Sequence, residues 1–127
     1  MVNCVFCEMT KESYVIENAY FYGLFDKYPV TEGHMLIIPK RHAETLFELT
    51  EDERKALFEM IQEGKALLEK KFNPAGFNFG VNQGLVAGQT IPHLHLHIIP
   101  RYVGDMEDPE GGVRGVIPEK QKYRHKM

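Results

Sequence analysis

The stretch QTIPHLHLHIIPR, residues 89–101, places histidines at three alternate positions, His93, His95 and His97. Side chains alternate between the two faces of a β-strand, so the three imidazoles share one face and the apolar residues between them share the other. The apolar face can pack against a core, and the histidine face must then line an open surface or a cleft. The pattern predicts a half-buried strand over residues 93–100 whose second face carries functional side chains.

Three interpretations of the histidine face remain open at this point: hydrogen-bonded structural histidines, metal ligands, or a nucleophile acting on phosphorus. Two histidines at i and i+2 can bind one zinc ion. All three cannot, because the strand from His93 to His97 spans about 13 Å and zinc–nitrogen bonds are about 2 Å long. A neutral imidazole is available as a nucleophile near pH 7, since the unperturbed pKa of histidine is about 6.5. A covalent intermediate on it would split one hard displacement into two easier ones.

The residues before the histidine stretch suit phosphoryl chemistry. Gln89, Thr90 and Asn82 carry hydrogen-bond donors for phosphoryl oxygens, and such positioning and charge stabilisation account for most of the catalysis in phosphoryl transfer. Gly84 and Gly88 would let backbone N–H groups approach a ligand closely. These residues support the nucleophile interpretation, and zinc binding by two of the three histidines stays open beside it.

Apolar and turn patterns predict five strands and one long helix. We expect strands over residues 13–18, 19–26, 34–40, 76–83 and 93–100, a helix over 50–72, and a short helix after Arg41. Thr50 and Glu53 form a capping box at the start of the long helix. The order β-β-β-α-β-β predicts an α+β fold, a five-stranded antiparallel sheet with helices on one face. The tail from about residue 105 is expected to be irregular, and its basic end, with His125, solvated.

Composition narrows the class of protein. The length of 127 residues fits a single domain over 1–127, and 43% hydrophobic with 26% charged residues is typical of a globular protein. The net charge of −3 argues against a nucleic-acid partner but permits a small anionic ligand. No apolar run could span a bilayer and no N-terminal signal region is visible. We therefore expect a cytoplasmic protein without a membrane partner.

Cys4 and Cys7 are the only cysteines. In a cytosolic protein this CxxC spacing indicates either half of a zinc site or a redox pair. The βαβ context of thioredoxin-like redox motifs is missing here, which favours zinc. A closed zinc site needs two further ligands.

Several segments besides PHLHLHII (92–99) carry a resemblance to a known family. They are CVFCEM (4–9), LFDKYPVTEGHMLIIPKRH (24–42), GFNFGVNQGLVAGQT (76–90) and PRYVGD (100–105). In this order and spacing they resemble the histidine triad (HIT) family of nucleotide hydrolases and transferases. The resemblance covers nearly the whole chain to about residue 105 and is much more specific than the HxHxH pattern alone. It implies the same α+β sheet and a homodimer with a continuous ten-stranded sheet.

The resemblance also implies a role for each matching residue. His95 would attack the α-phosphate and become nucleotidylated, with its other nitrogen donating to the carbonyl of His93. His97 would assist the leaving group, and Gln89 and Thr90 would hold phosphate and leaving-group oxygens. The remaining nucleotide-binding residues would be Asn82 in the same pocket, Asp26 at the ribose hydroxyls, and Phe6 and Leu24 around the base.

A metal site follows from the same resemblance. Some HIT proteins, including the uridylyltransferase branch, have an N-terminal cysteine pair, and their remaining ligands match two histidines of this chain. The implied ligands of a structural Zn²⁺ are Cys4, Cys7, His42 and His93. Such a site would tie the N-terminus to the histidine strand.

The resemblance implies a purine nucleotide or nucleotide conjugate as the ligand and leaves two enzyme branches open. The AGQT and PR…GD segments favour hydrolysis of dinucleoside polyphosphates, whereas CxxC and Asp26 favour a nucleoside phosphoramidase. A nucleotide-binding adaptor with little turnover is the alternative. Among the other polar residues, we interpret Lys40 and Arg41 as a solvated strand end and His34 as structural. Arg114 either reaches a phosphate or lies in a disordered tail.

Overall fold

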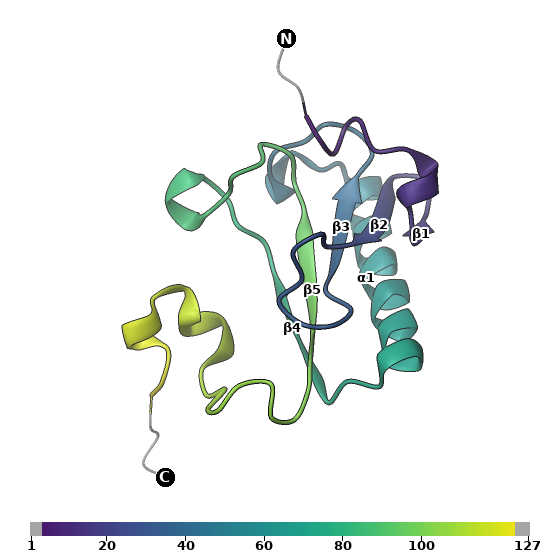
Figure 1. Ribbon diagram of the computed structural model, residues 1–127. Coiled ribbons are helices and arrows are strands. Elements are labelled where there is room, and N and C mark those ends of the chain that lie inside the picture. The colour runs from purple at the N-terminus through teal and green to yellow at the C-terminus, as the bar shows by residue number, and fades with distance from the viewer. Residues whose placement is uncertain (1–3, 124–127) are drawn as a thin grey trace.

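The computed structural model describes residues 4–123, so the basic end with His125 lies outside the described residues. In chain order the elements are η1 (Lys11–Ser13), β1 (Ile16–Glu17), β2 (Phe21–Phe25), β3 (Met35–Pro39), η2 (Leu46–Glu48), α1 (Glu51–Phe72), β4 (Gly76–Gly80), η3 (Leu85–Ala87), β5 (Leu96–Arg101), η4 (Gly112–Val116) and η5 (Pro118–Lys120). The strands form one antiparallel sheet in the order β1-β2-β3-β5-β4. Figure 1 shows α1 running along one face of this sheet. The predicted α+β class and five-stranded antiparallel sheet are confirmed.

The α1 helix begins with the predicted capping box. The Thr50 side chain accepts a hydrogen bond from the Glu53 N–H (3.1 Å), and the Glu53 carboxylate accepts one from the Thr50 N–H (2.8 Å). These bonds satisfy two backbone donors that the first helical turn cannot pair internally. The helix ends at Asn73, which adopts a left-handed conformation with φ 51°. Both ends of α1 are thus set by local sequence.

The apolar residues of the histidine stretch pack on the α1 side of the sheet, as predicted. Leu94, Leu96 and Ile98 are all buried in this core. The facing stripe of α1 is made of its buried small and apolar residues: Ala56, Leu57, Met60, Gly64 and Leu68. The opposite face of the sheet carries a second, smaller core to which the N-terminal segment contributes: Cys4, Phe6, Tyr22, Leu24, Leu36 and Ile38. The chain around the histidines is therefore held from both faces.

The β5 strand begins later than the predicted strand over 93–100. Its ladder with β3 ends at the pair Ile37–Leu96, because β3 ends at Pro39, which has no N–H to continue a ladder. Upstream, the Leu94 N–H bonds instead to the carbonyl of Ala43 (2.7 Å). The first two histidines consequently lie on the chain segment before β5 and not on the strand itself.

Other elements also differ from expectation. β1 has only two residues, β4 ends at Gly80, and the short helix expected after Arg41 is the single 3₁₀ turn η2. The tail is folded into η4 and η5 because the Arg114 guanidinium donates to the carbonyls of Lys120 (2.8 Å) and Gln121 (3.2 Å). No helix within residues 4–123 is long and apolar enough to cross a membrane.

Gly64 sets how closely α1 approaches the sheet. A Cβ at this position would lie 3.1 Å from the sulfur of Met35 and 3.2 Å from Cδ1 of Ile98. We predict that Gly64→Val lowers the free energy of unfolding by about 1–3 kcal/mol, the usual cost of overpacking, as measured by urea denaturation. Ala66→Val is the matched control, because Ala66 is exposed on the same helix, and should lower stability by about 0.7 kcal/mol or less, the largest propensity cost of an ordinary residue in a helix. Equal losses in the two variants would contradict this packing argument.

Candidate active site

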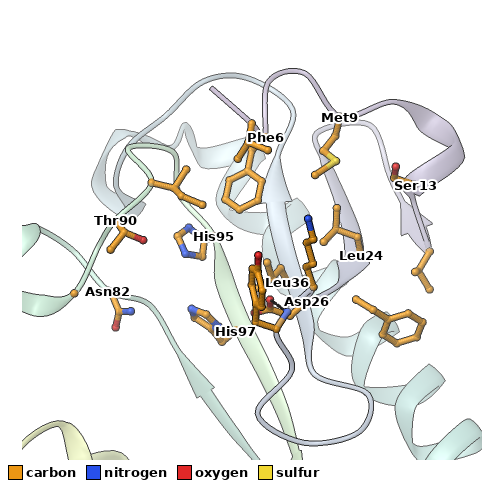
Figure 2. Close-up of a pocket in the computed structure, with 17 residues that line it drawn as sticks. Phe6, Met9, Ser13, Leu24, Asp26, Leu36, Asn82, Thr90, His95 and His97 are labelled. Atoms are coloured by element: carbon orange, nitrogen blue, oxygen red, sulfur yellow. Dashed lines mark hydrogen bonds between the residues drawn. The ribbon is translucent and has the colours of Figure 1, made fainter. Parts of the chain in front are cut away.

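A cleft of about 750 Å³ opens on the face of the sheet opposite α1. Most residues assigned to the site from sequence line it: Phe6, Leu24, Asp26, Asn82, Thr90, His95 and His97. Figure 2 shows His95, His97, Asn82 and Thr90 on one side of the cleft and Leu24, Met9 and Ser13 on the other, with Phe6 between them. The cleft therefore has a polar side rich in hydrogen-bonding groups and a largely apolar side, an arrangement suited to a ligand with one charged and one aromatic part.

His95 is held with one ring nitrogen directed into the cleft. Its Nδ1 lies 3.0 Å from the backbone carbonyl oxygen of His93. A carbonyl can only accept a hydrogen bond, so Nδ1 carries the proton and Nε2 keeps its lone pair. The His95 ring lies against Phe6, with ring centroids 5.2 Å apart. This geometry orients the ring and leaves Nε2 without a hydrogen-bond partner among the bonds of the described residues.

His97 belongs to a buried cluster that the sequence did not reveal. Its Nδ1 lies 2.9 Å from Nε2 of His34, which in turn lies 3.4 Å from Oδ2 of Asp26. His34, interpreted from sequence as structural, is only 3% exposed. The two histidines meet because β3 pairs with β5 next to them, at Met35–Ile98 and Leu36–His97. That register is a tertiary feature, and no local sequence pattern could have predicted it.

Burial keeps the His34 and His97 rings of this cluster neutral near pH 7. The pKa of His97 is lowered to about 4, mainly because burial disfavours the charged ring, with smaller contributions from His95 and His34 and an opposing one from Asp26. Burial also lowers the pKa of His34, again opposed by Asp26. His97 can therefore act as a neutral hydrogen-bonding group in the cleft.

Gln89 does not line the cleft, unlike its neighbour Thr90. Its side-chain oxygen accepts from the Gly84 N–H (2.9 Å), and its amide nitrogen donates to the carbonyl of Glu44 (3.0 Å). Both glycines of this loop, Gly84 and Gly88, have positive φ angles of 90° and 98°, which only glycine adopts without strain. In this arrangement Gln89 fixes the shape of the loop beside the histidines. Its amide nitrogen has a second N–H that neither of these bonds uses.

The four predicted metal ligands lie together. The ligand atoms of Cys4, Cys7, His42 and His93 are all within 4.8 Å of one another. Sγ of Cys4 is 3.2 Å and Sγ of Cys7 3.4 Å from Nδ1 of His93, and Sγ of Cys7 is 3.1 Å from Nδ1 of His42. Ligand atoms around a tetrahedral zinc ion lie roughly 3.3–3.8 Å apart, given its bond lengths to sulfur and nitrogen. The cluster is thus close to the size of a four-coordinate site.

The hydrogen bonds of His93 also fit a metal ligand. Its Nε2 lies 2.8 Å from the carbonyl oxygen of Pro39 and donates to it, so Nδ1 keeps a lone pair directed at the two sulfurs. Metal-binding histidines usually have such an outer hydrogen bond, which fixes the ring and its tautomer. The side chains of these four residues could therefore hold a metal ion.

The loop that carries the cysteines also carries one wall of the cleft. Phe6 lies between Cys4 and Cys7 in sequence, and its ring contacts both His93 (centroids 5.8 Å apart) and His95. The hydroxyl of Tyr22 donates to the Phe6 carbonyl (2.6 Å). The metal-ligand cluster and the cleft therefore share one short piece of chain, in which Cys4 and Phe6 are buried.

Arg41 is exposed, with its side chain 49% accessible, but it also has bonding partners that the sequence did not indicate. It donates to both carboxylate oxygens of Glu53 (2.8 and 3.0 Å) and to the carbonyl of Glu48 (2.9 Å). These bonds from Arg41 are the main reason that the pKa of Glu53 falls to about 2. They anchor the residue before His42 to the start of α1. Lys40 is also paired, with its ammonium 2.6 Å from the Glu17 carboxylate.

Comparison with known proteins identifies the family. The family model of the HIT domain matches residues 8–104. The chain belongs to the HIT family. Protein hit of Bacillus subtilis is 36% identical over 104 residues, which cover 79% of this chain and 72% of that protein.

Two further comparisons concern metal binding and enzymatic activity in similar proteins. The crystal structure of a Zn-bound histidine triad family protein from Mycobacterium smegmatis has a TM-score of 0.73 and 31% identity, covering 83% of this chain and 79% of that one. The asymmetrical bis(5'-nucleosyl)-tetraphosphatase of Schizosaccharomyces pombe is 40% identical over 80 residues, or 63% of this chain and 44% of that protein. One protein of similar structure is thus Zn-bound, and another relative is named as a tetraphosphatase.

Proposed function

We propose that this HIT protein is a hydrolase or nucleotidyltransferase that attacks the α-phosphate of a purine nucleotide conjugate through His95. The observation that carries the proposal is the hydrogen bond from His95 Nδ1 to the His93 carbonyl, which leaves Nε2 as a lone-pair nitrogen in the cleft. A nucleophile needs this fixed tautomer. Asn82 and Thr90 line the same part of the cleft and supply hydrogen-bond donors for the phosphoryl oxygens.

The reaction would proceed in two displacements. In the first, the lone pair of His95 Nε2 forms a bond to the α-phosphorus, and the bond from phosphorus to the leaving atom breaks with its electron pair going to that atom. In the second, water attacks the phosphorus and the bond to Nε2 breaks, which restores His95. One water proton ends on the leaving group, so the sum is hydrolysis. Another acceptor in place of water would make the protein a transferase.

The rest of the nucleotide would extend across the cleft. The apolar side with Phe6 and Leu24 suits a purine ring, since aromatic contacts there need no specific hydrogen bonds. Asp26 lies between the two sides, 18% exposed, with its carboxylate already accepting from the Tyr28 N–H (2.9 Å). Its remaining acceptor positions suit the ribose hydroxyls, because bonds to a carboxylate are charge-assisted.

The two possible substrates, a dinucleoside polyphosphate and a nucleoside phosphoramidate, differ in their leaving group. Names of relatives such as the Schizosaccharomyces pombe enzyme support a dinucleoside polyphosphate, whereas a phosphoramidate fits the same nucleophile. Steady-state rates with a fluorogenic adenosine phosphoramidate and with diadenosine tetraphosphate would separate the two. Nucleotide binding with negligible turnover of both substrates would instead favour the adaptor.

We further propose that Cys4, Cys7, His42 and His93 bind a structural Zn²⁺. Thiolate and imidazole ligands together suit zinc, and the Zn-bound relative from Mycobacterium smegmatis supports the assignment. A closed four-ligand site supplies folding energy and no open coordination position for substrate. A reducing compartment such as the cytoplasm would keep both cysteines as thiols.

A homodimer is the third part of the proposal. Among the described strands β4 is at the edge of the sheet and pairs only with β5. Its Phe79 is 40% exposed, which an edge strand in water would not favour. Pairing of two β4 edges about a two-fold axis would give a ten-stranded sheet and cover both aromatic rings.

The nucleophile is tested by His95→Asn. We predict that turnover falls by roughly three orders of magnitude, or about 4 kcal/mol of barrier, because the covalent step is lost. Binding of AMP or GMP should stay within a few-fold of wild type by calorimetry, since the phosphate and ribose contacts come from other residues. Acid-quenched wild-type protein should carry a nucleotidyl group that the variant lacks. Retention of more than about a tenth of the wild-type rate would rule out His95 as the nucleophile.

The metal is tested by elemental analysis of protein purified without chelator. We predict one zinc per chain in the wild type and little in the double variant Cys7→Ser/His42→Gln, because two ligands cannot hold the ion. His97→Gln is the matched control, a histidine outside the cluster, and should keep its zinc. Metal-free wild-type protein would contradict the assignment, as would equal loss of zinc in the control.

The dimer is tested by sedimentation velocity. Phe79→Lys should shift the protein from dimer to monomer, because a charge on a buried edge strand opposes pairing. Phe47→Lys replaces another exposed aromatic residue, on η2 and away from β4, and should stay dimeric. A wild-type protein that sediments as a monomer at micromolar concentration would disprove the proposal.

A further inference from the structure

His34 lies directly behind His97 and has no role in the two displacements described above. Its side chain is 3% exposed, and both of its ring nitrogens have partners. Nδ1 lies 3.0 Å from the backbone nitrogen of Val30, and Nε2 lies 2.9 Å from Nδ1 of His97. These two contacts together determine where the protons of both histidines are.

The backbone amide of Val30 is the starting point, because an N–H can only donate. Nδ1 of His34 must therefore carry a lone pair, and the single N–H of this neutral imidazole is on Nε2. That N–H donates to Nδ1 of His97, so the proton of His97 is on its own Nε2. The carboxylate of Asp26, 3.4 Å from Nε2 of His34, attracts the same N–H and favours the same tautomer.

Each of the two rings has a single N–H because both rings are neutral. Burial lowers the pKa of His34 and is also the main reason that the pKa of His97 lies at about 4. Neither ring has a second proton near pH 7, so a donor on one nitrogen means an acceptor on the other.

His95 has the opposite arrangement. Its Nδ1 donates to the His93 carbonyl, which leaves a lone pair on Nε2. The rings of His95 and His97 have their centroids 5.2 Å apart and line the same cleft. One therefore offers the cleft a nucleophilic nitrogen, and the other offers it an N–H donor.

We propose that His34 is a positioning residue that fixes His97 as the Nε2–H tautomer, so that His97 donates a hydrogen bond to the leaving atom while His95 attacks. This inference rests on the proposed function. As the bond from phosphorus to the leaving atom breaks, the electron pair moves onto that atom, and the N–H of His97 stabilises the developing charge. His97 keeps its proton, and the leaving group takes its own from water. Neutral imidazole donors serve this purpose in other enzymes.

The alternative tautomer shows what His34 contributes. With its proton on Nδ1, His97 would direct a lone pair at the electron-rich leaving atom and repel it. A comparable tautomer error in a serine protease triad costs about 10⁴-fold in kcat. The penalty should depend on the leaving group, because a group that departs with more localised charge needs the donor more.

Two substitutions separate positioning from structural support. His34→Gln keeps an amide N–H near the position of Nε2, and His34→Met keeps similar bulk without any donor. We expect kcat of His34→Met to fall about 100-fold with an alkyl phosphoramidate of AMP and less than tenfold with the p-nitrophenyl ester of AMP, whose leaving group is stabilised by resonance. His34→Gln should recover most of the lost rate. Equal losses with both substrates, or no difference between folded Gln and Met variants, would overturn the proposal.

Nitrogen-15 NMR of the histidine rings tests the tautomers without any turnover. Wild-type protein should show His97 and His34 protonated on Nε2 and His95 protonated on Nδ1, and His34→Gln should keep the His97 pattern. A wild-type His97 protonated on Nδ1 would overturn the proposal even if the His34→Met variant fails to fold. If the tautomers are as expected and both substrates are inert, the proposed function fails and the assigned tautomers remain.

Discussion

The hydrogen bond between His93 Nε2 and the Pro39 carbonyl, 2.8 Å long and fully buried, is the contact on which both halves of the site depend. Pro39 cannot extend the β3 ladder, so its carbonyl is available to a side chain. The bond fixes the His93 ring with Nδ1 directed at the two cysteines. It also holds the backbone of His93, whose carbonyl accepts from His95. His93 thus belongs to the Cys4, Cys7, His42 and His93 cluster through its side chain and holds the proposed nucleophile, His95, through its main chain.

A rigid support surrounds this contact. On one face, Leu94, Leu96 and Ile98 pack into the core against α1, where Gly64 permits close approach. At the edge of the site, Arg41 joins the chain before His42 to Glu53 in the first turn of α1. Glu53 of the capping box therefore also restrains His42, one of the four predicted metal ligands. Because these restraints fix the segments that carry the histidines, the ring orientations in the cleft are set before any ligand binds, which is the condition for electrostatic preorganisation.

Local patterns in the sequence predicted what depends on neighbours along the chain. The alternation of residues 93–100 correctly separated a core face from a cleft face, although the ladder begins only at Leu96. The capping box and the helix limits are similarly local. The pairing of His34 with His97 was missed because it depends on the register between β3 and β5. The bonds from Arg41 to Glu53 and from Gln89 to Glu44 were also missed, because these partners lie too far along the chain for any local pattern to indicate. Site roles beyond this geometry came from the family resemblance.

The position of Phe6 between Cys4 and Cys7 has a thermodynamic consequence. Its ring lines the cleft, and the thiols on either side belong to the metal-ligand cluster, so neither can move far without the other. If an ion in the cluster changes the freedom of this loop, it changes the affinity of the cleft for a ligand. Linkage then requires the ligand to change the affinity for the ion by the same factor. Oxidation of the thiols, or loss of an ion from the cluster, would accordingly change the fraction of protein that has a ligand in the cleft. In the other direction, a bound ligand would change how tightly the cluster holds the ion.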